Sequence, residues 1–274
     1  MNSLKTHKST LYLAAGASLA LLIGSTGCAP LKARDQLNQG VRAFKVAKYA
    51  EAVEHFRTAT ELDPKLPAAR LYLATAYYSQ YIPGAESPEN MELAKNAYEE
   101  YLKVLEQEPG NELALASIAS LYFHQKKWPE AEEWYGKLIA ANPNNKEGLY
   151  TMGVIAWTKS FQKRMEARAK LGMKPEDPGP LKDKKIREPL AAELMPIINK
   201  GIENLEKALQ VDNEYDDSMA YMNLLLRERA DLQDSPEAYK KDIETADGWV
   251  SKTMDTKKIK LERSAKTTGG IVQE

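Results

Sequence analysis

The sequence predicts an all-α protein, an α-solenoid of about five helical hairpins with an elongated helical hairpin inserted in the fourth. Three observations lead to this fold class. Residues 111–143 carry apolar side chains at helical spacing in two segments, separated by a short break at residues 125–128. Pro109 and Pro143 are 34 residues apart, which is the period of a helix–turn–helix repeat. Related patterns occur in phase before and after this stretch.

The clearest repeat, residues 111–143, shows how each hairpin is expected to pack. The first of its two helices has an apolar face made of Leu115, Ile118, Ala119 and Tyr122. The second has a face made of Ala131, Tyr135 and Leu138, and Pro143 closes the unit. Such a stripe is buried only against a neighbouring helix, so each hairpin needs the hairpins beside it.

Five units follow one another, at about residues 31–64, 67–109, 111–143, 146–213 and 216–254. Pro64 and Pro109 are 45 residues apart, so the second unit is 11 residues longer than the repeat and contains a widened loop at about residues 81–91. The fourth unit is 36 residues longer, because 70 residues separate Pro143 from Asn213. Helical spacing continues through this insertion, at about residues 160–195, and predicts a hairpin that projects beyond its neighbours. Residues 255–274 are expected to form a disordered tail.

The central repeat has an apolar residue, a small residue and Tyr, then Ala and an aromatic residue four positions later, and a terminal Pro. This order resembles the tetratricopeptide repeat, and the resemblance extends over residues 31–254. It implies that residues 28–254 form one solenoid of tetratricopeptide-like hairpins.

The first 27 residues have the organisation of a secretory signal peptide. Lys5 and Lys8 form a basic start, residues 11–23 are apolar, and small residues lead into Cys28, the only cysteine of the chain. The apolar run is too short for an ordinary membrane-spanning helix.

The segment Ser25-Thr26-Gly27-Cys28 resembles the lipobox of bacterial lipoproteins, although Ser25 stands where an aliphatic residue is usual. The resemblance implies that residues 1–27 are a lipoprotein signal peptide and that Cys28 is the lipid attachment site. It also implies a place in the bacterial cell envelope, and Ala29 after the cysteine resembles outer-membrane sorting, on the periplasmic side. The alternative is ordinary signal cleavage beside an incidental cysteine, which would give a soluble periplasmic module.

Composition gives no general reason to bind nucleic acid. Without residues 1–27 the chain has 36 basic and 39 acidic residues, a net charge near −3. His55 and His124 have no second His or Cys at ligand spacing, so neither a metal nor a cofactor is expected. No phosphate-binding loop or nucleophile motif occurs in the sequence, and we predict no enzymatic activity.

The insertion in the fourth unit is locally basic. Residues 158–190 contain ten Lys or Arg and five Asp or Glu, a surplus that is suited to anionic lipid or an acidic partner. The alternative is a solvated pair of charged helices, and the sequence favours this reading.

In tetratricopeptide proteins the first helix of each hairpin lines a concave groove. The resemblance places nine residues of this chain in that groove: Phe44, Tyr72, Tyr78, Phe123, His124, Tyr150, Trp157, Tyr221 and Arg227. The Lys, Asn and Arg set that grips a peptide carboxylate is absent, since Leu37, Val41 and Ala68 stand at those positions. An aromatic groove suits an extended or helical apolar peptide. Any one of these rings can instead pack between repeats.

These observations predict a lipid-anchored scaffold or adaptor that binds protein or peptide partners, in a role of the envelope-, secretion- or pilus-assembly type. The alternative is a glycan- or peptidoglycan-binding accessory of an envelope enzyme.

Overall fold

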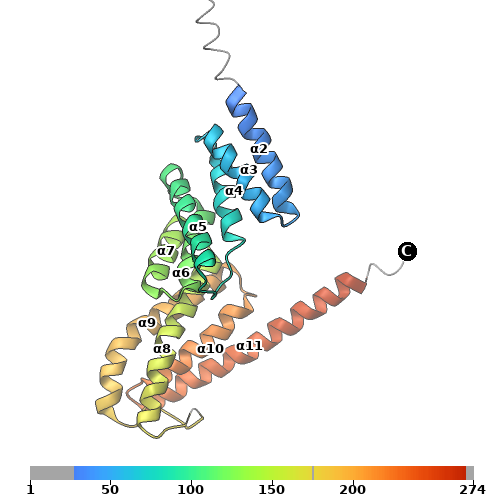
Figure 1. The fold of residues 1–274 in the computed structure, drawn as a ribbon. Helices are drawn as coiled ribbons and strands as arrows, with labels where there is room; N and C mark the ends of the chain where they lie inside the picture. Colours follow the sequence, from blue (N-terminus) through green and yellow to red (C-terminus); the bar gives the residue numbers. More distant parts are fainter. Residues whose placement is uncertain (1–27, 175, 270–274) are drawn as a thin grey trace, which may run out of the picture. The chain divides into compact units, whose positions relative to one another are not determined.

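The computed structural model describes residues 28–174 and 176–269 (Figure 1). This part of the chain forms ten α-helices and no strand, which confirms the predicted all-α class. The helices are α2 (Cys28–Lys45), α3 (Tyr49–Leu62), α4 (Pro67–Tyr78), α5 (Pro88–Gln107), α6 (Glu112–His124), α7 (Trp128–Ala141), α8 (Lys146–Lys170), α9 (Lys184–Val211), α10 (Asp216–Asp231) and α11 (Pro236–Gly269). The predicted signal peptide lies outside the described residues, and Cys28 is the first residue of α2.

The chain divides into two compact units, the first ending at Lys127 and the second beginning at Trp128. We predicted one array over residues 28–254, whereas the boundary falls between the two helices of the central repeat. In a repeat protein each hairpin packs mainly on its neighbours, so compactness is a local property.

In the first unit α2 packs on α3 and α4 on α5, and α2, α3 and α4 share a core that includes the fully buried Phe56. Gly40 makes the close approach possible, because a Cβ atom there would lie 2.5 Å from Cε1 of Phe56. The loop between α4 and α5 is shorter than the predicted insertion at residues 81–91. Pro88 already begins α5, and the Ser87 side chain caps it by accepting a hydrogen bond from the Asn90 N–H.

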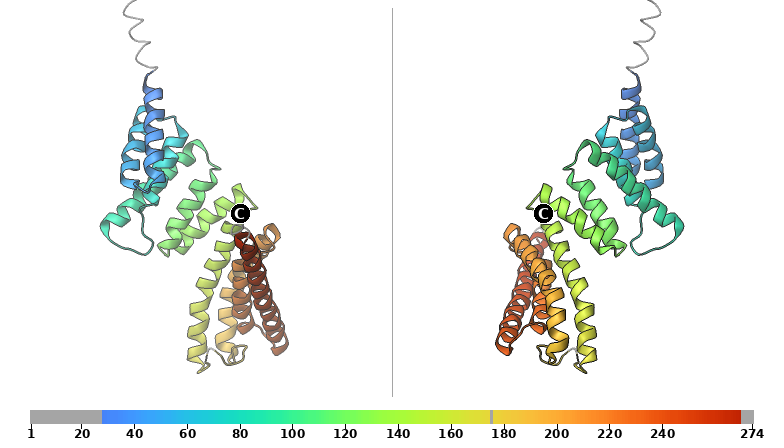
Figure 2. Two further views of the ribbon diagram at one scale, coloured as in Figure 1. Left: turned by 90° about the vertical axis from the view of Figure 1, so that its right-hand side faces the viewer. Right: turned by 90° about the vertical axis from the view of Figure 1, so that its left-hand side faces the viewer.

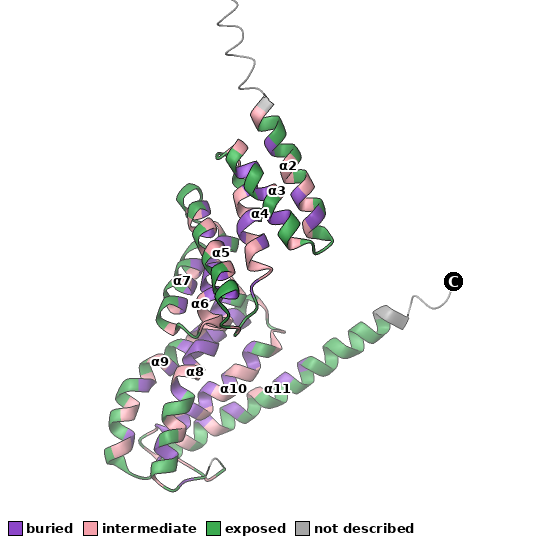
Figure 3. Ribbon diagram, in the orientation of Figure 1, coloured by how far each residue is buried: buried purple, intermediate pink, exposed green. Residues whose placement is uncertain are grey.

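The second unit contains the long hairpin that the insertion was predicted to form. Helices α8 and α9 pack along each other in every view (Figures 1 and 2). Their closest approach is at two glycines: a Cβ atom on Gly153 would lie 2.5 Å from Leu205, and one on Gly201 would lie 2.5 Å from the Cβ of Ala156. Buried residues line the facing sides of α8, α9 and α10 (Figure 3).

The tip of this hairpin is docked, which corrects the prediction that the hairpin projects beyond its neighbours. Arg168, near the end of α8, is 2% exposed and donates to both carboxylate oxygens of Asp231 at 2.8 Å. Arg164 donates to Asp231 at 2.7 Å and to Glu228 at 2.6 Å. The backbone N–H of Leu181, in the tip loop, donates to the Asp231 carbonyl at 2.9 Å. The insertion is therefore fastened to the end of α10.

The same contacts account for much of the basic surplus of the insertion. Besides Arg164 and Arg168, Arg187 donates to the Leu181 carbonyl at 2.7 Å. Lys159 pairs with Glu132 at 2.9 Å, and Lys163 pairs with Glu193. Half of the ten basic side chains are thus engaged within the unit. The others are exposed: Lys170, Lys174, Lys182, Lys184 and Lys185.

The predicted disordered tail is wrong for residues 255–269, which continue α11. Lys260 pairs with Asp216 at the start of α10, and Arg263 pairs with Glu214 at 2.7 Å. Thr253 and Thr256 are buried against the unit. These contacts join residues far apart in sequence and hold a segment whose local composition suggested fraying.

None of the helices within the described ranges combines the length and the apolar composition that a membrane span requires.

Replacing Asp231 tests whether the ionic cluster holds the insertion. We expect Asp231→Ala to lower the free energy of unfolding by about 3–5 kcal/mol, because the buried Arg168 would lose its carboxylate partner and Arg164 would keep only Glu228. The matched control is Asp247→Ala, which removes the carboxylate paired with Arg227 at the surface. That change is expected to cost about 0–1 kcal/mol. Urea unfolding measures both, and equal small effects would show that the cluster does not stabilise the unit.

Candidate functional site

The nine residues predicted to line one groove are divided between the two units. Five lie in the first unit (Phe44, Tyr72, Tyr78, Phe123 and His124) and four in the second (Tyr150, Trp157, Tyr221 and Arg227). The structure brings three of the four in the second unit into one cluster. Those of the first unit form separate contacts.

The cluster in the second unit is a continuous series of five aromatic rings, which we call the aromatic row. It consists of Tyr215, Tyr150, Tyr221, Trp157 and Phe161. Neighbouring ring centroids along the series are 5.3, 5.5, 5.7 and 5.0 Å apart. Both contacts of Tyr221 are edge-to-face, a favoured arrangement for aromatic pairs. Phe161 is 39% exposed and the other four rings are half-buried.

Helix geometry explains how the row arises. Tyr150, Trp157 and Phe161 follow one another at spacings of seven and four, which places them on one side of α8. Tyr221 comes from α10, the helix that packs beside α8, and Tyr215 immediately precedes α10. Four of the rings pack against the buried core of the unit. The core therefore holds one side of each of these four rings in place, while part of their surface remains accessible to solvent.

The hydroxyl groups of the row remain protonated at neutral pH. Burial raises the pKa of Tyr215 to about 12, with further contributions from Glu147 and Asp217. Burial also raises the pKa values of Tyr150 and Tyr221, and Asp217 adds to both. The tyrosine end of the row thus offers neutral hydroxyl groups near Glu147 and Asp217, with the Lys146 ammonium 5.0 Å above the Tyr215 ring.

Arg227, the fourth predicted residue of the second unit, lies apart from these ring contacts. Its guanidinium donates to Asp247 of α11 and, at 2.8 Å, to Asn223 of its own helix. It connects α10 to α11 at the surface.

Two predicted residues of the first unit pack between helices. Phe44 meets Tyr49 edge-to-face at 5.1 Å, and Tyr72 stacks on the buried Phe56 at 5.4 Å. Tyr78 shares a 2.8 Å hydrogen bond with Ser120 of α6, and its ring lies 6.5 Å from Tyr101. The contacts of Tyr72 with Phe56 and of Tyr78 with Ser120 fit the alternative that the rings join neighbouring repeats, whereas Phe44 meets Tyr49 within the first hairpin.

Phe123 and His124 lie at the end of α6, with ring centroids 5.7 Å apart. His124 lines a cavity of about 350 Å³, whose other walls include Tyr81, Glu86 and Lys126. Burial lowers the pKa of His124, so its ring is neutral at physiological pH.

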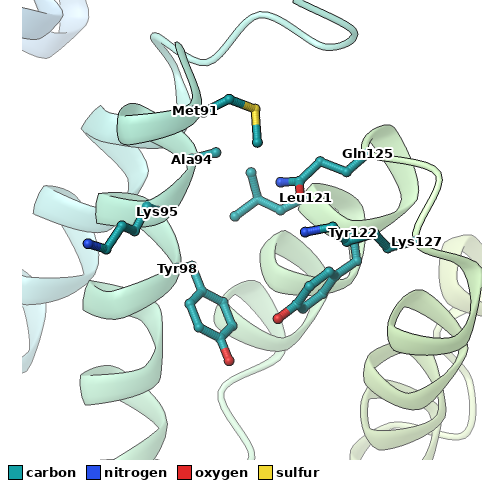
Figure 4. A pocket seen from close by; sticks show the side chains of 8 residues that line it. All are labelled: Met91, Ala94, Lys95, Tyr98, Leu121, Tyr122, Gln125 and Lys127. Carbon is teal, nitrogen blue, oxygen red and sulfur yellow. The ribbon is translucent and has the colours of Figure 1, made fainter. Parts of the chain in front are cut away.

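A smaller cavity of about 190 Å³ adjoins it between α5 and α6 and shares Met91, Gln125 and Lys127 with it. In Figure 4 the side chains of Met91 and Leu121 extend toward each other across this cavity. Of the residues around both cavities, only His124 was predicted as a binding residue, whereas Tyr122 was predicted to pack within its repeat. The insertion at about residues 81–91 was predicted as a loop, but α5 already begins at Pro88 within it and contributes Met91 to the wall.

In the described ranges, no group of three or more His, Cys, Asp or Glu side chains is arranged to hold a metal ion.

Comparison with known proteins identifies tetratricopeptide repeats in this chain. Family models of the tetratricopeptide repeat match residues 37–81 and 89–152. A segment of 123 residues is 32% identical to sperm-associated antigen 1 of Rattus norvegicus, and it covers 45% of this chain and 12% of that protein. The match thus spans a small part of the relative's length.

Solved structures with the same fold include those of MamA. A crystal structure of MamA is 13% identical, with a TM-score of 0.56 over 84% of this chain and 94% of that one. MamA from Desulfovibrio magneticus RS-1 is 17% identical, with a TM-score of 0.53 over 83% of this chain and 96% of that one. At these identities the likeness shows the fold alone, a solenoid of helical hairpins.

The lowered pKa of His124 predicts a pH dependence of stability. The unfolded chain takes up a proton near the ordinary pKa of 6.5, and the folded His124 does so only at a lower pH. The free energy of unfolding is therefore expected to fall as the pH drops from about 6.5 to the folded pKa. In His124→Gln this part of the pH dependence should be absent, as urea unfolding between pH 8 and 5 would measure. An NMR titration of His124 with a midpoint at or above 6.5 would contradict the prediction.

Proposed function

We propose that this protein is a lipid-anchored adaptor of a bacterial cell envelope, which binds an apolar segment of a partner protein on the aromatic row. Tetratricopeptide repeats are scaffolds for protein and peptide interactions, and this coarser role follows from the repeats in residues 37–81 and 89–152. The observation that carries the finer proposal is the unbroken series of five partly accessible rings.

Aromatic rings supply large contact areas with few rotatable bonds, so binding orders them at a small cost in entropy. In the row this cost is reduced further, because each ring is already held by the next and four pack on the core. The tyrosine hydroxyl groups add donors that stay protonated at neutral pH. An apolar peptide segment, extended or helical, fits this combination of flat surfaces and hydrogen-bond donors.

The charge near one end of the row adds a preference. Glu147 and Asp217 are exposed and act on the tyrosine hydroxyl groups. Asp212 and Asp216 are also near Tyr215, but they already pair with lysines. Lys146 already lies 5.0 Å above the Tyr215 ring and interacts with Glu147, so we expect a Lys or Arg of the partner segment to lie opposite Asp217.

The membrane anchor rests on the sequence of residues 1–28. Cys28 is also the first residue of α2, so an acylated Cys28 would join the lipid directly to the first hairpin. Two or three acyl chains hold a protein firmly at a membrane, since each buried CH₂ contributes roughly 0.8 kcal/mol.

Phe161→Ala is the sharpest test of the row, because Phe161 is its most exposed ring and packs least on the core. Partners are first trapped in cells with a photo-crosslinking phenylalanine analogue at position 161, and the trapped segment is made as a peptide. We expect Phe161→Ala to weaken binding of this peptide roughly tenfold, which corresponds to about 1.4 kcal/mol. The free energy of unfolding should change by less than about 1 kcal/mol.

The matched control is Val211→Ala on α9, an exposed apolar residue outside the row. It should leave peptide binding unchanged. Equal binding by both variants, or crosslinks to glycan strands and to no protein, would overturn the proposed use of the row.

Cys28→Ala tests the anchor separately. Wild-type protein made in a bacterial host is expected to incorporate labelled palmitate and to partition into the detergent phase of Triton X-114. Cys28→Ala should lose both properties, because no thiol remains for acylation. Binding of the peptide should persist in the variant. Unlabelled, water-soluble wild-type protein would rule out the anchor and leave the row untouched.

A further inference from the structure

Asn204, in the middle of α9, is a buried polar side chain that the proposed function does not use. It is 4% exposed, and no hydrogen bond joins its side-chain amide to any residue in the described part of the chain. A primary amide offers two donors and an acceptor, and neither the nitrogen nor the oxygen of Asn204 is fully enclosed. The amide therefore keeps donors and an acceptor that a ligand can reach.

Asn204 lines a cavity of about 270 Å³ between α7, α8 and α9. The other uncharged residues of its wall are Met152, Ala156, Pro196, Ile197 and Gly201. Small-molecule sites usually measure about 300–1,000 Å³, so this cavity is suited to one apolar side chain. Asn204 is the sole uncharged polar group among these wall residues.

The two charged residues of the wall are already paired. Glu132 accepts hydrogen bonds from Lys159 at 2.9 Å, and Lys200 donates to Glu203 at 2.9 Å. The cavity thus presents an apolar surface and one unpartnered amide, with no net charge to attract an ion. A neutral ligand that carries both a donor and an acceptor fits this chemistry.

The cavity and the aromatic row lie on different sides of α8. Met152 and Ala156 follow Tyr150 by two and six positions, so at 3.6 residues per turn they face away from the side that carries Tyr150 and Trp157. A ligand of the cavity would therefore occupy a surface separate from the row.

We propose that this cavity is a second peptide-binding site, which takes one apolar side chain of about leucine size together with the backbone N–H and C=O of the same residue. The Asn204 Oδ1 accepts a hydrogen bond from the N–H of the bound residue, and its Nδ2 donates to the C=O of the same residue, because the N–H and C=O of one trans peptide group point in opposite directions. A peptide backbone is the common ligand that supplies a donor and an acceptor next to an apolar side chain. Binding gives the buried amide the partners that it lacks, and the side chain removes apolar wall from water.

N-acetyl-leucine N-methylamide, the smallest ligand with all three features, is the probe for the test. It is titrated into protein labelled at methionine methyl groups and at asparagine side-chain amides, and NMR follows Met152 and Asn204. We expect saturable shifts of both. N-acetylglycine N-methylamide, which lacks the side chain, should give no saturable shift. N-acetyl-leucine methyl ester, whose ester carbonyl is a weaker acceptor than the amide carbonyl, should bind roughly two- to tenfold more weakly.

Asn204→Leu should abolish the saturable shift of Met152, because the amide that bonds the peptide is replaced by an apolar group. The matched control Asn213→Leu, at an exposed position, should leave the shift of Met152 intact. Phe161→Ala should also leave it intact, which separates this site from the row. Unsaturable shifts, equal binding of amide and ester, or binding retained by a folded Asn204→Leu would overturn the proposal.

Discussion

The buried ionic cluster at the end of α10 is the interaction on which the organisation of the second unit depends. Asp231 and Glu228 on α10 meet Arg164 and Arg168 on α8, so two negative and two positive charges balance. Removing such groups from water is costly, and the attraction between them offsets the cost only when their hydrogen-bonding capacity is filled. Arg168 meets this condition by also donating to the backbone carbonyls of Lys174 and Asp177. One side chain thus neutralises an acid of α10 and closes the loop that follows α8.

This docking matters for function because α8 carries residues of both proposed binding surfaces. Tyr150, Trp157 and Phe161 point to one side, and Met152 and Ala156 contribute to the cavity beside α9. A helix that ended in a loose hairpin would transmit the motion of its tip to these side chains. Fastened at its far end and packed through Gly153 and Gly201 along its length, α8 holds both surfaces at fixed positions.

The parts of the fold that depend on local sequence pattern could be predicted from the sequence. The 34-residue spacing placed α6 and its start, where Asn111 accepts a hydrogen bond from the Ala114 N–H at 3.0 Å. The sequence did not predict the structure where contacts between residues far apart in the chain determine it. Arg164 and Glu228 are 64 positions apart and Lys260 and Asp216 are 44 apart, so a projecting hairpin and a frayed tail were reasonable readings of local composition.

For the candidate sites too, the features set by local pattern could be predicted and those set by distant contacts could not. Helical spacing predicts that Tyr150 and Trp157 share a side of α8, but not that Tyr215, from outside α10, completes the row. Nothing in the sequence distinguishes Asn204 from the asparagines that face solvent, since its burial depends on how α7, α8 and α9 pack together.

The presence of two proposed sites on opposite sides of α8 also affects how tightly an adaptor of this kind can bind its partner. One leucine-sized side chain with one or two hydrogen bonds gives only weak binding, and the row acting alone offers a flat surface. A partner that engages both makes the second contact within an existing complex, where the effective concentration is set by the connecting segment and reaches the millimolar range when that segment is short. Anchoring through Cys28 would act in the same direction, because it confines the protein to the surface at which membrane-bound partners are found. Affinity for the correct partner can then come from the spacing of two modest sites, and a single apolar segment elsewhere in the envelope would be held only briefly.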